Sequence, residues 1–185
     1  MNMKTDRLRT LIMAGAMASS SLLGSTDARG ALAEGATAPN ATLEDADGRV
    51  SETRAFRGKP LLIVYEDRDS AKQNEALKKE LGELARGDRY RARIALAAVA
   101  DVSAWDFWPA KGFVKDAIRD ESKKQGTTIY CDWSGAFRKA YDLRRGVSNV
   151  VLVGKDGRVL FTAEGTVPAA SRKRLIAMLR EQVEG

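Results

Sequence analysis

Short apolar runs alternate along this chain with longer segments whose apolar residues recur at helical spacing. Four runs are short and apolar enough to predict buried strands, and they span residues 61–65, 91–100, 127–131 and 150–153. A fifth predicted strand, residues 158–163, follows the fourth through Gly154-Lys155-Asp156-Gly157, a turn typical of an antiparallel hairpin.

The segments between the strands have the periodicity of amphipathic helices. The clearest case is residues 70–85, where the leucines fall on one face. Similar spacing predicts two more helices, at residues 113–124 and 169–183. Asp132 or Ser134 is a candidate N-cap for a further short helix that continues through Tyr141.

A polar turn precedes the first buried strand. Asp47-Gly48 lies between residues 42–45 and residues 50–53, and this pattern predicts a small β-hairpin. Strands and helices then alternate for most of the chain. This order predicts a single α/β domain in which helices flank a central mixed sheet.

The first 33 residues have a different character. Three basic residues precede an apolar stretch at residues 11–23, and Ala31-Leu32-Ala33 follows with the small-x-small pattern of a signal-peptidase site. We therefore expect a signal peptide over residues 1–33, cleavage after Ala33, and a periplasmic or secreted domain of residues 34–185. The alternative is a membrane anchor, but the apolar stretch is short for a stable bilayer span.

Composition excludes several classes of chemistry. The chain has no histidine, which excludes Ser-His-Asp and Cys-His catalysis and histidine-ligated metals. Its single cysteine, Cys131, excludes an internal disulfide and a C-x-x-C pair. Removing residues 1–33, with four Lys/Arg and two Asp/Glu, lowers the formal net charge from +6 to +4. The remaining charges alternate in sign, so no nucleic-acid surface is expected.

The order of motifs resembles the thioredoxin-like superfamily of bacterial envelope proteins. The likeness covers about residues 35–183 and rests on the lead-in Phe56-Arg57-Gly58-Lys59-Pro60 and the closing hairpin Lys155-Asp156-Gly157-Arg158-Val159. The chain is more narrowly similar to a cysteine-poor branch, the YtfJ-type exported proteins. That likeness rests on short motifs in the expected order, which are Ser70-Ala71-Lys72, Asp88-Arg89-Tyr90, Glu121-Ser122-Lys123-Lys124 and the closing hairpin. The resemblance implies a thioredoxin-like three-layer sandwich with an added N-terminal β-hairpin.

The resemblance also implies where redox chemistry would lie. In redox-active relatives a C-x-x-C motif opens the first long helix, and its two cysteines correspond here to Ser70 and Gln73. Such relatives also carry a cis-proline just before the strand at residues 150–153, whereas this chain reads Gly146-Val147-Ser148-Asn149. A dithiol–disulfide oxidoreductase is therefore not expected. Ser70 is instead expected to cap the helix, because serine is strongly favoured at that position.

Other residues are candidates for the edge of the sheet where strands end, because ligands gather there in α/β folds. Cys131 ends a predicted strand, and the two interpretations are a buried inert thiol or a reactive one. A binding rim is predicted from four carboxylates and two aromatic residues, which are Asp67, Asp69, Asp101, Asp132, Trp105 and Trp108. Converging carboxylates could hold Ca²⁺ or Mg²⁺, or could instead cap helices and pair with cations.

These observations favour a non-catalytic binding or interaction module of the cell envelope. Its expected partner is a protein or peptide, and no cofactor, metal or stable membrane anchor is expected. The first alternative is a single-cysteine thiol or peroxide-reactive enzyme that uses Cys131. The second is a carboxylate-lined cation-binding domain.

Overall fold

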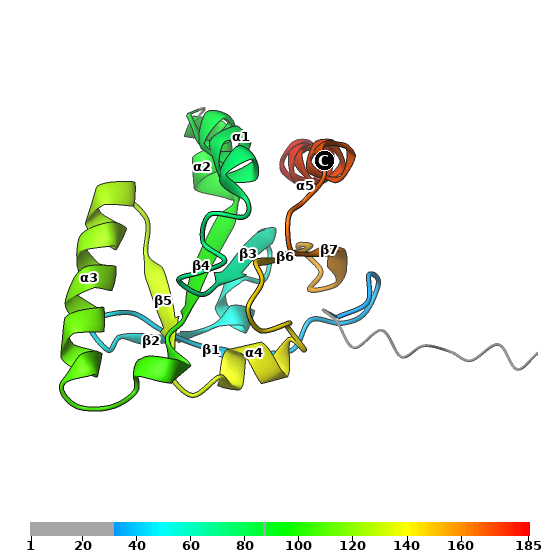
Figure 1. Ribbon diagram of the computed structural model, residues 1–185. Helices are drawn as coiled ribbons and strands as arrows, with labels where there is room; N and C mark the ends of the chain where they lie inside the picture. The colour runs from blue at the N-terminus through cyan, green and yellow to red at the C-terminus, as the bar shows by residue number, and fades with distance from the viewer. Residues whose placement is uncertain (1–31, 87) are drawn as a thin grey trace, which may run out of the picture.

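The computed structural model describes residues 32–86 and 88–185, and its centre is a five-stranded mixed sheet in the order β5-β4-β3-β6-β7 (Figure 1). The central strand β3 (Leu61–Glu66) pairs in parallel with β4 (Ala95–Asp101) and antiparallel with β6 (Asn149–Val153). The edge strands are β5 (Ile129–Asp132), parallel to β4, and β7 (Val159–Glu164), antiparallel to β6. The expected mixed sheet is confirmed.

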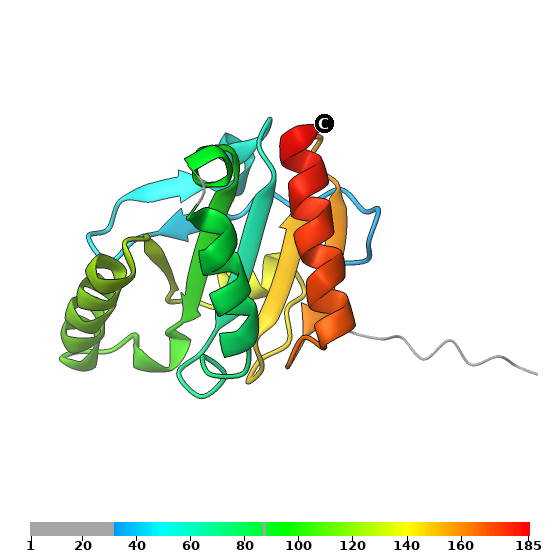
Figure 2. The ribbon, with the colours of Figure 1, turned by 90° about the horizontal axis from the view of Figure 1, so that it is seen from above.

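Helices and a hairpin cover the two faces of this sheet. Figures 1 and 2 show α1 (Glu75–Ala85), α2 (Asp88–Arg93) and α5 (Ala169–Glu184) over one face. On the opposite face lie the short helix α4 (Ala136–Ala140) and the hairpin of β1 (Thr42–Glu44) and β2 (Val50–Glu52). The helix α3 (Ala110–Gln125) lies at the side, beyond β5. This is the predicted three-layer sandwich with its N-terminal hairpin.

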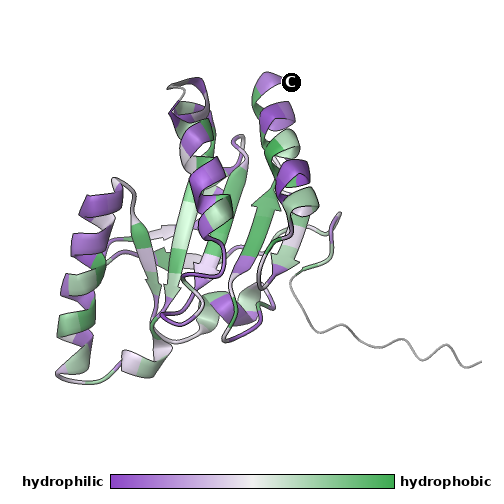
Figure 3. Ribbon diagram, turned by 45° about the horizontal axis from the view of Figure 1, so that its top comes forward, coloured by the Kyte–Doolittle hydropathy of each residue, from purple (hydrophilic) through white to green (hydrophobic). Residues whose placement is uncertain are grey.

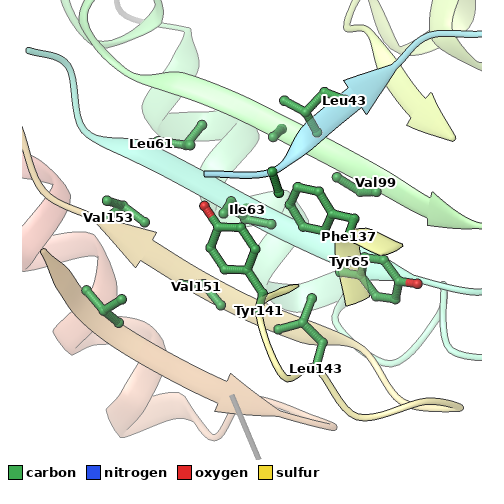
Figure 4. Packing of buried hydrophobic residues seen from close by; sticks show 13 residues of the cluster. Leu43, Leu61, Ile63, Tyr65, Val99, Phe137, Tyr141, Leu143, Val151 and Val153 are labelled. Atoms are coloured by element: carbon green, nitrogen blue, oxygen red, sulfur yellow. The ribbon is translucent and has the colours of Figure 1, made fainter. Parts of the chain in front are cut away.

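One core lies between the sheet and the layer of β1 and α4. Tyr65, Phe137 and Tyr141 stack in series, with ring centroids 6.0 Å and 4.8 Å apart. Aliphatic side chains from β1, β3 and β6 surround these rings (Figure 4). Because β3 is covered on both faces, its residues form a continuous apolar run, as buried parallel strands do.

A second core lies beneath α1 and α5. Leu62 and Val64 of β3 pack there against Leu77 of α1 and against Leu175 and Leu179 of α5. Figure 3 shows the same division, with hydrophobic strands and with helices whose outward residues are hydrophilic. Burial of these apolar side chains contributes most of the stability of both layers.

Several predicted boundaries are wrong for local reasons. The helix predicted from residue 70 begins at Glu75, because Asp67 binds backbone N–H groups of the preceding segment and holds it in turns. The strand predicted from residue 91 begins at Ala95, because residues up to Arg93 form α2. The strands predicted at residues 127–131 and 158–163 are shifted by only one or two residues.

The predicted signal peptide lies almost entirely outside the described residues. Only its last two residues are described: Leu32 packs against the first core, and the Ala33 carbonyl accepts the N–H of Ala36 at 3.1 Å. Across residues 32–86 and 88–185, no helix combines the length and apolar character needed to span a membrane.

Candidate functional site

The turn between β3 and α1 holds Ser70 in a closed hydrogen-bonded loop with Asp67. The Ser70 hydroxyl donates to the Asp67 carboxylate at 2.7 Å, and it accepts the Asp67 N–H at 2.9 Å. The same carboxylate accepts the N–H groups of Asp69 and Ser70. Ser70 is fully buried, and the N-cap of α1 is Asn74. The expectation that Ser70 caps the helix is therefore wrong, because its hydroxyl bonds Asp67 and the N-cap lies further along the chain, at Asn74.

Gln73, the second position of the absent cysteine pair, contacts the loop that precedes β6. The Ser148 N–H donates to the side-chain oxygen of Gln73 at 2.9 Å. The Ser148 hydroxyl donates to the Glu66 carboxylate at 2.8 Å, and the other oxygen of Glu66 accepts from Lys78. The two places where relatives carry redox groups are thus joined directly by polar side chains.

Asn74 completes this network from the buried side. Its Nδ2 donates to the Ser148 hydroxyl at 2.8 Å and to the Gly165 carbonyl at 2.9 Å. Its Oδ1 accepts the Val167 N–H at 2.8 Å. Asn74 and Ser148 are buried, so each polar atom needs such a partner. Sequence reasoning missed Asn74, Ser148 and Glu66, because these contacts join residues more than 70 positions apart.

Cys131 is 5 % exposed and lies beneath α3, away from this network. Its apolar neighbours include Val102, Val114 and Trp133. Burial, with a further contribution from the Glu44 carboxylate, raises the pKa of the Cys131 thiol to about 11. A thiol with this pKa is almost fully protonated at pH 7, which is the behaviour of a structural cysteine.

The structure places the predicted carboxylates in different surroundings, although Asp101 and Asp132 are register partners on β4 and β5. Asp132 is buried, where it accepts the Tyr65 hydroxyl at 3.1 Å and the Arg138 N–H at 3.0 Å. Asp101 accepts the N–H and hydroxyl of Ser103. Burial and the carboxylates of Asp132 and Asp101 raise the pKa of Tyr65. Asp69 is exposed.

A metal centre needs several such ligands together. Within the described ranges 32–86 and 88–185, no group of three or more His, Cys, Asp or Glu side chains is arranged to hold a metal ion. The carboxylates Asp67, Asp101 and Asp132 each accept hydrogen bonds from the protein. The helix-capping role weighed against cation binding is wrong for these residues, because the N-caps of α1 and α4 are Asn74 and Gly135 and neither helix has a side-chain cap.

The aromatic residues separate into two groups. Trp105, Phe107 and Phe113 are exposed, and Trp108 is 90 % exposed. Trp133 is buried instead, with the Lys111 ammonium 4.6 Å from its ring centroid. Trp105 and Trp108, the two aromatic residues of the predicted binding rim, therefore lie at the surface.

A groove that was not predicted runs beside these aromatic residues. It lies between α1 and α2 on one side and α3 on the other, with β4 as its floor, and its volume is about 1560 Å³. Its lining includes Asp67, Asp101 and Trp105 from the predicted rim. The sequence carries no signal for this groove, because β4 is apolar at nearly every position, whereas in the structure the buried Ala97 and Val99 alternate with less buried neighbours.

Comparison with known proteins places the chain in a family. Residues 66–182 match the family model YtfJ_HI0045, described as a bacterial protein of unknown function. The chain belongs to this family. The narrower resemblance to YtfJ-type proteins is thereby confirmed. Among curated proteins, none matches the chain.

Solved structures support the thioredoxin-like fold of this YtfJ_HI0045 family member. A protein from Chlorobium tepidum named as a thiol:disulfide interchange protein, DsbE, is 17% identical with a TM-score of 0.61, covering 82% of this chain and 99% of that chain. An uncharacterized conserved protein from Geobacillus kaustophilus is 17% identical with a TM-score of 0.63, covering 83% of each chain. An exposed lipoprotein thioredoxin from Streptococcus pneumoniae is 14% identical with a TM-score of 0.50, covering 77% and 98%. At these identities the likeness concerns the fold alone.

Proposed function

We propose that this protein is an exported thioredoxin-fold binding module that performs no dithiol–disulfide exchange. The observation that carries the proposal is the 2.9 Å hydrogen bond from the Ser148 N–H to the Gln73 side chain. It occupies the position at which redox relatives bring a cysteine beside a proline loop. Disulfide exchange requires a thiolate that attacks a disulfide sulfur, and neither Ser70 nor Gln73 supplies sulfur.

The environment of Cys131 argues against the single-cysteine alternative. Nucleophilic thiols are partly exposed and have depressed pKa values. Cys131 is buried, and its pKa of about 11 lies above the ordinary value of a thiol. Lys111 and Lys115 act to lower this pKa, but burial and the carboxylate of Glu44 have the larger effects.

Export is supported by the N-terminal pattern and by the fold relatives. A basic start, an apolar stretch and the Ala31-Leu32-Ala33 site are typical of secretory signals. One fold relative is described as an exposed lipoprotein thioredoxin and another as a thiol:disulfide interchange protein. N-terminal sequencing of the protein recovered outside the cytoplasm tests this directly, with Glu34 expected as the first residue.

The absence of thiol chemistry is tested by comparing wild type with Cys131→Ser. We expect both to reduce insulin disulfides in the presence of dithiothreitol no faster than buffer, with a C-x-x-C thioredoxin as the positive control. A wild-type rate above buffer that Cys131→Ser abolishes would establish the thiol-enzyme alternative. A rate that persists in Cys131→Ser would also contradict the proposal, since it would require chemistry that is independent of the thiol.

A further inference from the structure

The groove between α1 and α3 has an apolar floor and apolar walls. Leu96, Ala98 and Ala100, which alternate along β4, form the floor. Leu96 remains 41% exposed. Leu81 and Leu84 of α1 line one wall. On the other wall, the α3 residues Phe113, Val114, Ala117 and Ile118 recur at three- and four-residue spacing.

An open apolar surface of this kind is unusual on an isolated domain. Phe113 is 73% exposed, and Trp105 is 41% exposed at one end of the same groove. Contiguous exposed apolar patches mark interaction sites in soluble proteins. The two alanines of the floor are small, so they allow another backbone to approach the sheet closely.

The dimensions of the groove match a peptide segment and exceed those of a small ligand. Small-molecule pockets measure about 300–1,000 Å³, whereas this groove is about 1560 Å³. The seven residues of β4 extend for about 23 Å at roughly 3.3 Å per residue. A helix of that length has about 15 residues at 1.5 Å per residue, and it would lie over β4 between α1 and α3.

The two ends of the groove carry opposite charge. The end of the groove where β3 and β4 end is acidic. Its lining carries three carboxylates and one cation, which are Asp67, Glu75, Asp101 and Arg68. Glu66 and Lys78 also lie there, and their ion pair has no net charge. At the opposite end lie Arg86 and Arg91. Neither of these two arginines forms an ion pair within the described ranges of the chain. Glu121 of α3 also lines the groove, but its carboxylate is already paired with Lys124.

We propose that this groove binds an amphipathic α-helix of another protein, oriented parallel to α1 and α3. The apolar face of that helix packs on β4, with its positive amino end near Asp67 and Asp101. Acidic side chains in its last turn pair with Arg86 and Arg91. This orientation matches the helix dipole to the charge at each end of the groove. The inference rests on the proposed binding function and names the chemistry of its partner.

The test uses a 15-residue probe helix with leucines and alanines on one face, lysines in its first turn and glutamates in its last turn. A second probe exchanges the lysines and glutamates. Isothermal titration calorimetry with the full domain is expected to show saturable binding of the first probe. The charge-exchanged probe is expected to bind at least about tenfold more weakly, because like charges then meet at both ends.

Variants locate the binding on the protein. Leu96→Glu places a charge on the groove floor and is expected to weaken binding at least about tenfold. The matched control is Val50→Glu, since Val50 is an exposed apolar residue of β2 outside the groove, and its binding is expected to be unchanged. Arg86→Glu combined with Arg91→Glu is expected to reverse the preference between the two probes. If Leu96→Glu does not fold, Phe113→Ser on the opposite wall replaces it.

Specific outcomes would overturn the inference. Absence of probe binding, or equal binding by Leu96→Glu, would exclude a helix in this groove. So would occupation of the groove by a second copy of the chain, seen in sedimentation as a dimer that Leu96→Glu dissociates. None of these results bears on the thiol measurements, so failure of this inference is distinguishable from failure of the proposed function.

Discussion

The side-chain oxygen of Gln73 accepts the backbone N–H of Ser148 at 2.9 Å, across 75 positions of the chain. This bond connects the turn after β3 to the loop before β6. The neighbouring Asn74 connects the same turn to Gly165 and Val167, beyond β7. The side chains of Gln73 and Asn74 therefore hold together three segments that are distant in sequence.

Replacing Gln73 with alanine should destabilise the protein by about 1–3 kcal/mol, because the Ser148 N–H loses its partner in a buried position. Chemical unfolding in urea measures the change. The matched control is Lys72→Ala, an exposed neighbour in the same turn, which should change the free energy of unfolding by less than about 0.5 kcal/mol. Equal stabilities for the two variants would show that water replaces the amide of Gln73.

Replacing Asn74 with alanine should cost more than replacing Gln73. Three hydrogen bonds are lost at a side chain that is only 2% exposed, and each contributes roughly 1 kcal/mol. A loss of about 2–4 kcal/mol is therefore expected in the same unfolding experiment. A loss smaller than that of Gln73→Ala would contradict the central position of Asn74.

Replacing Tyr65 with phenylalanine tests the buried carboxylate of Asp132. The change removes one of the two donors to that carboxylate and leaves the Arg138 N–H, so a loss of about 1–3 kcal/mol is expected. Tyr90→Phe is the control, because the Tyr90 hydroxyl also donates to a carboxylate, that of Glu184, but at an exposed site. Its cost should stay below about 1 kcal/mol, and a larger cost at Tyr90 would contradict the assignment.

The stability of the protein should fall as pH rises from 9 to 11. The folded state raises the pKa of Cys131 from 9.0 to about 11, so over this range the unfolded chain releases a proton that the folded chain retains. The stabilisation is fully present below pH 9, and about 2–3 kcal/mol is lost by pH 11, at about 1.4 kcal/mol per pKa unit. The difference between wild type and Cys131→Ala in urea unfolding at pH 8, 9, 10 and 11 isolates this contribution from the tyrosines. A difference that is independent of pH would contradict it.

Calcium and magnesium should leave the melting temperature unchanged. A cation that binds the folded state at 100 times its Kd would add about 2.7 kcal/mol of stability, which shifts the melting temperature of a domain of this size by several degrees. We expect a shift below 1 °C at millimolar concentrations, because Asp67, Asp101 and Asp132 are engaged by protein donors. A saturable upward shift that Asp67→Asn abolishes would restore the cation-binding alternative.

The strands and long helices were predictable because their signal is local. Residues 61–65 and 150–153 are apolar without interruption, and the structure buries both on two faces. Residues 169–183 carry helical spacing, and the structure places α5 at Ala169–Glu184. The start of α1 was not predictable in the same way. It depends on hydrogen bonds from the Ser70 hydroxyl and from the N–H groups of Asp69 and Ser70 to the Asp67 carboxylate.

The sequence by itself determined the class of fold, the family resemblance and the lack of a C-x-x-C pair. Each of these follows from which residues are present and in what order, and one cysteine cannot form a pair. Only the tertiary structure decided which side chains meet. It buried Cys131 beneath α3, joined Gln73 to Ser148, and left the floor of β4 uncovered between α1 and α3. These features depend on packing between distant segments, and local periodicity carries no information about the distance between two helices on a sheet.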